Sequence, residues 1–193
     1  KMNKRIQSRL RAAHLRGCPQ ELSNCIDSAE REYLPRGITE TLAALDFIDS
    51  GLNVCILGPS DSGKSYLAKA LGIVACNNYK VEYHHCETLL ETLVALKAQD
   101  YSKYQKRLKK ICGAALLILD DFLLHTITDE REVKVLFEIL EKRCEINLST
   151  IICSQREPAS WSSMILNDEV SANAILKRAT KHYTVVIKPN ITD

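Results

Sequence analysis

Residues 58–65 read GPSDSGKS and match the spacing Gly-x-x-x-x-Gly-Lys-Ser. This spacing is typical of a loop that wraps the phosphates of a nucleotide, provided that a strand precedes it and a helix follows. Residues 52–58, LNVCILG, form a short apolar run that ends in glycine, and residues 64–77 carry apolar side chains at helical spacing. The predicted strand–loop–helix context therefore favours a phosphate-binding loop over a chance match.

Each residue type in this loop has a chemical reason. The glycines let the backbone turn its N–H groups towards phosphate oxygens, and the following helix adds the partial positive charge of its N-terminus. Lys64 is predicted to neutralise the β- and γ-phosphates, and the Ser65 hydroxyl to bind Mg²⁺. Asp61 is unusual, because a carboxylate beside bound anions weakens binding unless the side chain points outward. The predicted nucleotide-binding residues are Gly58, Pro59, Ser60, Asp61, Ser62, Gly63, Lys64, Ser65 and Tyr66.

A second motif, LLILDD at 116–121, supplies the acids that such a site needs. It is an apolar run, predicted to be a buried strand, that ends in two carboxylates. Asp120 is predicted to lie beside the magnesium ion, and Asp121 to orient or deprotonate the attacking water. Together the motifs predict a P-loop NTPase that uses Mg²⁺. The tandem acids favour hydrolysis over a small-molecule kinase, for which the sequence shows no Arg-rich lid.

The remaining pattern alternates between short apolar runs and amphipathic segments. Apolar strands separated by helices predict a mainly parallel sheet covered by helices on both faces, a three-layer α/β fold. Further strands are expected at 79–84, 149–155 and 183–188, and helices at 38–51, 86–100, 128–144 and 172–182.

Residues 1–37 are expected to form a basic helical and irregular lead-in, and residues 38–193 the ATPase domain. Residues 1–16 carry six Lys or Arg and no acid, and residues 103–110 carry five with none. Such runs can contact phosphate backbones, although a solvated helix face explains them equally well. Residues 17–37 contain two prolines and two glycines and are expected to be irregular.

Composition excludes several classes of protein. The 193 residues are 46% hydrophobic and 26% charged, with a net charge of +2, which is ordinary for a globular domain. No apolar run approaches the roughly 20 residues of a membrane helix, and the basic N-terminal segment lacks the apolar core of a signal peptide. Eight cysteines without a Cys-x-x-Cys pair indicate a reduced, cytoplasmic protein. The HHC run at 84–86 has no second half-site with metal-ligand spacing, so no metal is predicted there.

The order of the motifs resembles one family. The chain resembles IstB-like transposition helper ATPases, which are AAA+ proteins encoded by insertion sequences and related to DnaC helicase loaders. The resemblance covers nearly the whole chain and implies the AAA+ form of the three-layer fold, here without a C-terminal helical lid. Its most particular part is STIICSQREPASW followed by AILKR. The other matching stretches are RIQSRLRAAHLR, GPSDSGKSYLAKALG, LLILDDF and TDEREVKVLFEILEKR.

The resemblance also implies site residues and partners. Gln155 stands where a polar residue contacts the γ-phosphate or its water; the alternative is a satisfied polar residue at a strand end. Arg178 resembles the arginine that reaches into a neighbouring subunit's ATP site; the alternative is a surface salt bridge. The implied function is a homo-oligomer that assembles on duplex DNA and assists a transposase. A DnaC-like helicase loader and a truncated nucleotide-binding module without hydrolysis are the alternatives.

Four features depart from the family pattern. Leu123 stands where the family usually has glycine, and Asp61 replaces a small or uncharged residue. The last residues, IKPNITD, do not match the Gly-x-Ser-x-Arg tail that often follows the last strand. The chain begins at Lys1 rather than Met and shows no N-terminal helical domain of the kind that engages the transposase. These departures are consistent with a truncated copy and motivate the module without hydrolysis.

Trp161 is expected to pack against the sheet rather than stack on a base.

Overall fold

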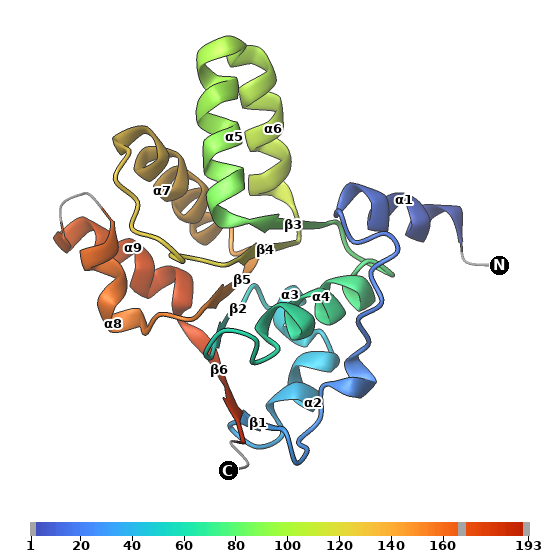
Figure 1. The fold of residues 1–193 in the computed structure, drawn as a ribbon. Coiled ribbons are helices and arrows are strands. Elements are labelled where there is room, and N and C mark those ends of the chain that lie inside the picture. Colours follow the sequence, from blue (N-terminus) through green and yellow to red (C-terminus); the bar gives the residue numbers. More distant parts are fainter. Residues whose placement is uncertain (1–2, 166–168, 191–193) are drawn as a thin grey trace.

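The computed structural model describes residues 3–165 and 169–190. Its centre is a six-stranded sheet in the order β1-β6-β2-β5-β4-β3 (Figure 1). All neighbouring strands pair in parallel except β1 and β6, which pair antiparallel. The strands are β1 (Arg31–Leu34), β2 (Asn53–Leu57), β3 (Val81–His85), β4 (Leu116–Asp120), β5 (Ser149–Ser154) and β6 (His182–Pro189).

Helices cover both faces of this sheet, as Figure 1 shows. The three-layer α/β fold predicted from the sequence is confirmed, and within the described residues no helical lid follows β6. The helices are α1 (Lys4–Ala12), α2 (Ile38–Ala43), α3 (Asp46–Asp49), α4 (Lys64–Ala75), α5 (Cys86–Gln99), α6 (Tyr101–Gly113), α7 (Glu130–Glu145), α8 (Pro158–Trp161) and α9 (Glu169–Thr180), with 3₁₀ turns η1 (Leu22–Asn24) and η2 (Ser162–Met164).

The alternation of side chains along the central strands divides the core in two. In β2, Cys55 and Leu57 pack with α5, α6, α7 and α9, whereas Val54 and Ile56 pack with α1, α2, α3 and α4. Every residue of β2, β4 and β5 is buried, as expected for strands covered on both sides. The near-continuous apolar runs in the sequence are the direct consequence.

Side-chain caps define the starts of three of these helices. Asn3, Asp100 and Asp129 accept backbone N–H groups from Arg5, Lys103 and Arg131, and so begin α1, α6 and α7. The basic helix α1 buries Leu10, and Arg9 Nη1 donates to the Asn77 carbonyl oxygen at 2.6 Å, just beyond the C-terminus of α4. The N-terminal segment therefore packs on the face of the sheet that α4 covers.

Two local predictions were wrong. The segment 17–37, expected to be irregular, contains β1, whose pairing partner β6 lies at the other end of the chain. The segment 38–51, expected to be one helix, forms α2 and α3, because Leu45 between them adopts a left-handed backbone with φ of 64°.

Other features of the core agree with the sequence. Trp161 is fully buried and packs edge-on against Phe122, with ring centroids 4.9 Å apart. All eight cysteines lie in the described part of the chain, and each is a free thiol. No helix among the described residues combines the length and the hydropathy that a bilayer crossing requires.

Arg143 is a charged side chain inside the core. It is 1% exposed, and burial lowers its pKa to about 10, so it stays protonated at neutral pH. Its Nε donates to Thr150 Oγ1, and its Nη atoms donate to backbone carbonyls that precede β4 and begin β5. The acceptors of the Nη atoms are Ile111, Cys112, Ala114 and Ser149. The guanidinium thus ties α7 to the ends of two sheet strands.

Replacing Arg143 is expected to destabilise the fold strongly. The substitution Arg143→Ala removes five donated hydrogen bonds and leaves buried acceptors unpaired, which costs about 3 kcal/mol or more of unfolding free energy. Urea denaturation measures this difference. The exposed neighbour Lys142 provides the control, since Lys142→Ala removes only a surface ion pair with Glu138. Equal unfolding midpoints for the two variants would show that the buried network contributes nothing.

Candidate functional site

The loop between β2 and α4 requires glycine at both of its ends. A Cβ atom on Gly58 would lie 2.6 Å from Ser62 Oγ and 2.8 Å from the Ile187 carbonyl oxygen. Gly63 has a φ of 102°, in the left-handed region, and a Cβ there would collide with the guanidinium of Arg31. The glycine spacing in the sequence therefore has a steric basis in the fold.

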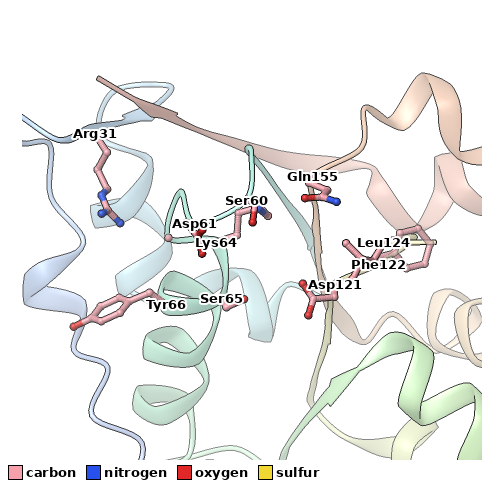
Figure 2. Close-up of a pocket in the computed structure, with 11 residues that line it drawn as sticks. Arg31, Ser60, Asp61, Lys64, Ser65, Tyr66, Asp121, Phe122, Leu124 and Gln155 are labelled. Atoms are coloured by element: carbon pink, nitrogen blue, oxygen red, sulfur yellow. The ribbon is translucent and has the colours of Figure 1, made fainter. Parts of the chain in front are cut away.

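This loop borders a cavity of about 440 Å³ at the carboxyl end of the sheet (Figure 2), a size typical of small-molecule sites. Six of the nine predicted loop residues line it, together with the predicted Asp121 and Gln155. The other three, Gly58, Pro59 and Ser62, belong to the same loop but do not line the cavity. The lining residues are Arg31, Ser60, Asp61, Gly63, Lys64, Ser65, Tyr66, Asp121, Phe122, Leu124 and Gln155.

Lys64 lies inside the curve of the loop. Its side chain is 8% exposed, and Nζ donates to the Pro59 carbonyl oxygen at 2.6 Å. Burial lowers the pKa of Lys64, while the negative charges of neighbouring acids, including Asp120 and Asp121, oppose that shift. The ammonium group is therefore held at the cavity with a carbonyl as its direct partner.

The two acids after β4 have different surroundings. Asp120 is fully buried, and its carboxylate accepts the Tyr83 hydroxyl and, at 2.9 Å, the Asp121 N–H. Burial and the nearby Asp120 charge raise the pKa of Tyr83, so its hydroxyl stays a donor. Asp121 is 46% exposed, and its Oδ2 lies 3.1 Å from Nδ1 of His85. Asp120 is thus fixed in the core and is not among the residues that line the cavity, whereas Asp121 borders it.

These residues fit a divalent cation. Mg²⁺ prefers oxygen ligands, which the Ser65 hydroxyl and the Asp120 carboxylate supply. The Asp120 carboxylate offers about four lone-pair sites, and two neutral donors use part of that capacity. The possible ligand atoms of His85, Asp120 and Asp121 also lie within 4.8 Å of one another. No metal was predicted at the HHC run; its His85 reaches the acids because β3 and β4 end at the same sheet edge.

The structure separates Arg178 from this cavity. Its Nη2 lies 3.5 Å from Glu141 Oε1, and both side chains are about half exposed. Arg178 therefore makes the surface salt bridge that was the alternative for it, within its own chain. Gln155, by contrast, lies at the end of β5 and borders the cavity beside Asp121 (Figure 2).

Arg31 is a site residue that the sequence did not indicate. It lies on β1, and its Nη1 donates to the Ser62 carbonyl oxygen at 3.1 Å. Figure 2 shows Arg31 and Tyr66 at one end of the cavity and Asp121 and Gln155 at the other. No local sequence pattern marks Arg31, because it reaches the P-loop only through the pairing of β1 with β6.

Comparison with known proteins gives consistent relatives. An insertion-sequence ATP-binding protein of Sinorhizobium fredii is 41% identical over 177 residues, which are 91% of this chain and 68% of that protein. The ATP-binding protein of insertion sequence IS21 from Pseudomonas aeruginosa is 32% identical over 154 residues, 79% of this chain and 56% of that protein. The chain therefore spans about two thirds of the first relative and little more than half of the second.

Solved structures show the same fold. The crystal structure of the DnaC helicase loader superposes with a TM-score of 0.61 at 20% identity, covering 96% of this chain and all of that one. AMPPCP-bound DnaA from Aquifex aeolicus gives a TM-score of 0.68 at 21% identity, covering 87% of this chain and 50% of that one. At these identities the likeness establishes the AAA+ fold alone. The family described as IstB-like ATP binding protein matches residues 1–190, and the chain belongs to that family.

Proposed function

We propose that the chain binds Mg-ATP in the cavity beside the P-loop and hydrolyses it. The observation that carries this proposal is the convergence of Lys64, Ser65, Asp121 and Gln155, from three separate segments, on one cavity. A cation, a hydroxyl, a half-exposed carboxylate and an amide are the groups that phosphoryl transfer to water uses. A strand-to-helix turn that binds no ligand would not need the carboxylate of Asp121 and the amide of Gln155 beside it.

Each of these side chains has a separate task. Lys64 would leave the Pro59 carbonyl and place its charge on the β- and γ-phosphates. Ser65 and Asp120 would hold Mg²⁺, which supplies charge neutralisation at the phosphate oxygens. Asp121 would orient or deprotonate the attacking water, with His85 fixing the carboxylate from behind, and Gln155 would contact the γ-phosphate or that water. Arg31 and Tyr66 would border the opposite end of the nucleotide.

The position of the arginines favours an oligomer. Arg31 is the only arginine among the described residues that line the cavity, and it lies at the end away from Asp121. The γ-phosphate end therefore receives no arginine from its own chain within the described part of the structure. Arg178 is half exposed on α9, and among the described residues its guanidinium makes a surface ion pair with Glu141, so it is free to enter the site of a neighbouring subunit.

The basic segments provide contacts for duplex DNA. Lys103, Lys106, Lys109 and Lys110 are exposed on α6, and Figure 1 shows the α5–α6 pair standing away from the sheet. Lys4, Arg5 and Arg11 are exposed on α1. Contacts of this kind bind phosphates with little sequence preference and weaken steeply with salt. Together with the insertion-sequence names of the relatives, they support an ATP-dependent oligomer that binds duplex DNA and assists a transposase.

Two substitutions separate nucleotide binding from hydrolysis. Lys64→Ala is expected to weaken ATP binding and abolish turnover, because it removes the phosphate-bound charge. Asp121→Asn is expected to retain binding and lower turnover by about 100-fold or more. Calorimetry measures binding, and phosphate release measures turnover with and without duplex DNA. Wild-type protein that binds ATP without any turnover would support the module without hydrolysis, and stimulation by single-stranded DNA alone would favour a helicase loader.

A mixing experiment tests the role of Arg178 in the neighbouring subunit. Arg178→Ala alone and Lys64→Ala alone are each expected to be inactive. Their mixture is expected to regain turnover, because Arg178 of one variant completes the intact ATP site of the other. Lys177→Ala, which alters the exposed neighbouring side chain, serves as the control and is expected to keep full activity. A mixture that stays inactive would contradict the proposal, as would full activity of Arg178→Ala alone.

Removing the charge of Asp61 is expected to tighten ATP binding. Asp61 is exposed, borders the cavity and has a left-handed φ of 60°. The substitution Asp61→Asn removes repulsion between its carboxylate and the triphosphate, which corresponds to about a tenfold lower Kd. Asp61→Gly removes backbone strain as well. Glu145→Gln, an equal charge change at the exposed end of α7, is the control. An unchanged Kd for Asp61→Asn would show that this carboxylate points away from the nucleotide.

A further inference from the structure

A second cavity, of about 620 Å³, lies beside β3 and is larger than the cavity at the P-loop. It is enclosed by residues of α4, β3, α5 and α6 and by the turn after α1; Figure 1 shows β3 between the base of the α5–α6 pair and α1. We call it the histidine pocket. Its lining residues are His14, Lys69, Tyr83, His84, His85, Thr88, Leu89, Thr92, Leu93 and Arg107.

The residues that line the histidine pocket include two cations, Lys69 and Arg107. None of its ten lining residues is acidic. The buried Glu82 beneath it is matched by Arg107, whose Nη1 and Nη2 donate to the two carboxylate oxygens at 3.0 and 2.9 Å. Lys69 adds a second cation: its Nζ lies 5.2 Å from the centroid of the Tyr83 ring, and no carboxylate among the described residues lies within salt-bridge distance.

Hydrogen-bond donors surround the same space. Helix α5 is 14 residues long and begins at this pocket, and its N-cap residue, His85, makes no side-chain cap to the first N–H groups. The acid in its first turn, Glu87, contacts His125 and does not line the pocket. Thr88 and Thr92 stand four positions apart on α5 and so present hydroxyls on one face. Leu89 and Leu93 form an apolar wall beside them. An unpaired cation, a helix N-terminus and two hydroxyls together match a tetrahedral oxyanion.

We propose that the histidine pocket binds a phosphate group, held by the Lys69 ammonium, the N-terminus of α5 and the hydroxyls of Thr88 and Thr92. The phosphate belongs to a nucleic-acid strand or to a free phosphate compound. The sugar or other group that carries the phosphate packs against Leu89, Leu93 and the Tyr83 ring. The nucleic-acid source rests on the proposed DNA binding, whereas the phosphate site itself does not.

Two residues of the histidine pocket contact the acids of the ATP site. The Tyr83 ring faces Lys69, and its hydroxyl donates to Asp120. His85 lines the histidine pocket and contacts Asp121 through Nδ1. A phosphate drawn to Lys69 therefore binds one side chain away from both acids, and its occupancy is expected to change the rate of ATP turnover.

Histidine side-chain NMR tests this site in the full chain. Inorganic phosphate is titrated at constant pH while excess Mg-ADP occupies the P-loop. The side-chain resonances of His14, His84 and His85 are expected to shift saturably. Those of His125 and His182, which do not line the pocket, are expected to stay unchanged. Absence of a saturable shift at the three pocket histidines, with phosphate and with oligonucleotides alike, would overturn the proposal.

Variants identify the group that holds the phosphate. Lys69→Ala and Lys69→Gln are expected to weaken phosphate binding at least tenfold, with ADP affinity unchanged. Lys134→Ala, which removes an exposed lysine on α7, is expected to have no effect. Thermal melting confirms that each variant is folded. If both Lys69 variants keep the wild-type phosphate affinity, the site is not where we place it.

Oligonucleotides distinguish the two sources of the phosphate. If short DNA strands shift the same three histidines at lower concentration than inorganic phosphate, the ligand is a nucleic-acid backbone. If only free phosphate shifts them, the ligand is a small phosphate compound. A protein that binds no DNA but keeps the Lys69-dependent phosphate shift would refute the proposed DNA function and support the phosphate site.

Discussion

The carboxylate of Asp120 is fully buried, and the conformation of the candidate site depends on the groups that contact it. Its two direct donors, the Tyr83 hydroxyl and the Asp121 N–H, are neutral, and within the described residues no lysine or arginine lies at salt-bridge distance. A buried carboxylate without a paired cation is costly to the fold. In the proposed function, a Mg²⁺ ion held by Asp120 would offset this cost, so the unpaired carboxylate would favour binding of the metal–nucleotide complex.

The topology of the sheet explains why distant residues meet at this charge. Strands β2, β5 and β4 are neighbours in the sheet and run in parallel, although they lie far apart in the sequence. Their carboxyl ends deliver the P-loop, Gln155 and the two acids to one edge. Open α/β sheets bind ligands at that edge, because loops from neighbouring strands converge there. The chemistry thus follows from strand order rather than from any single loop.

A site residue could be predicted from the sequence when the residues that position it are close to it in the chain. The P-loop and LLILDD were readable because each motif lies in one strand and the turn after it. Arg31 was not, since its place at the loop depends on β1 pairing with β6, more than 150 positions away. His85 and the buried Arg143 were missed for the same reason: their partners come from other elements. The role of Arg178 depends on a second subunit and stays a prediction.

Helix α4 borders both cavities. Lys64 at its start borders the ATP cavity, and Lys69, five positions later, borders the histidine pocket. Gly72 allows α4 to lie close against its neighbours: a Cβ there would be 2.8 Å from Leu15 Cδ1 and 2.9 Å from Ile118 Cδ1. Close-packed interiors of this kind have low compressibility and transmit strain. The proposed phosphate at Lys69 and the proposed nucleotide at Lys64 would therefore contact the same helix, in addition to the link through Tyr83 and Asp120.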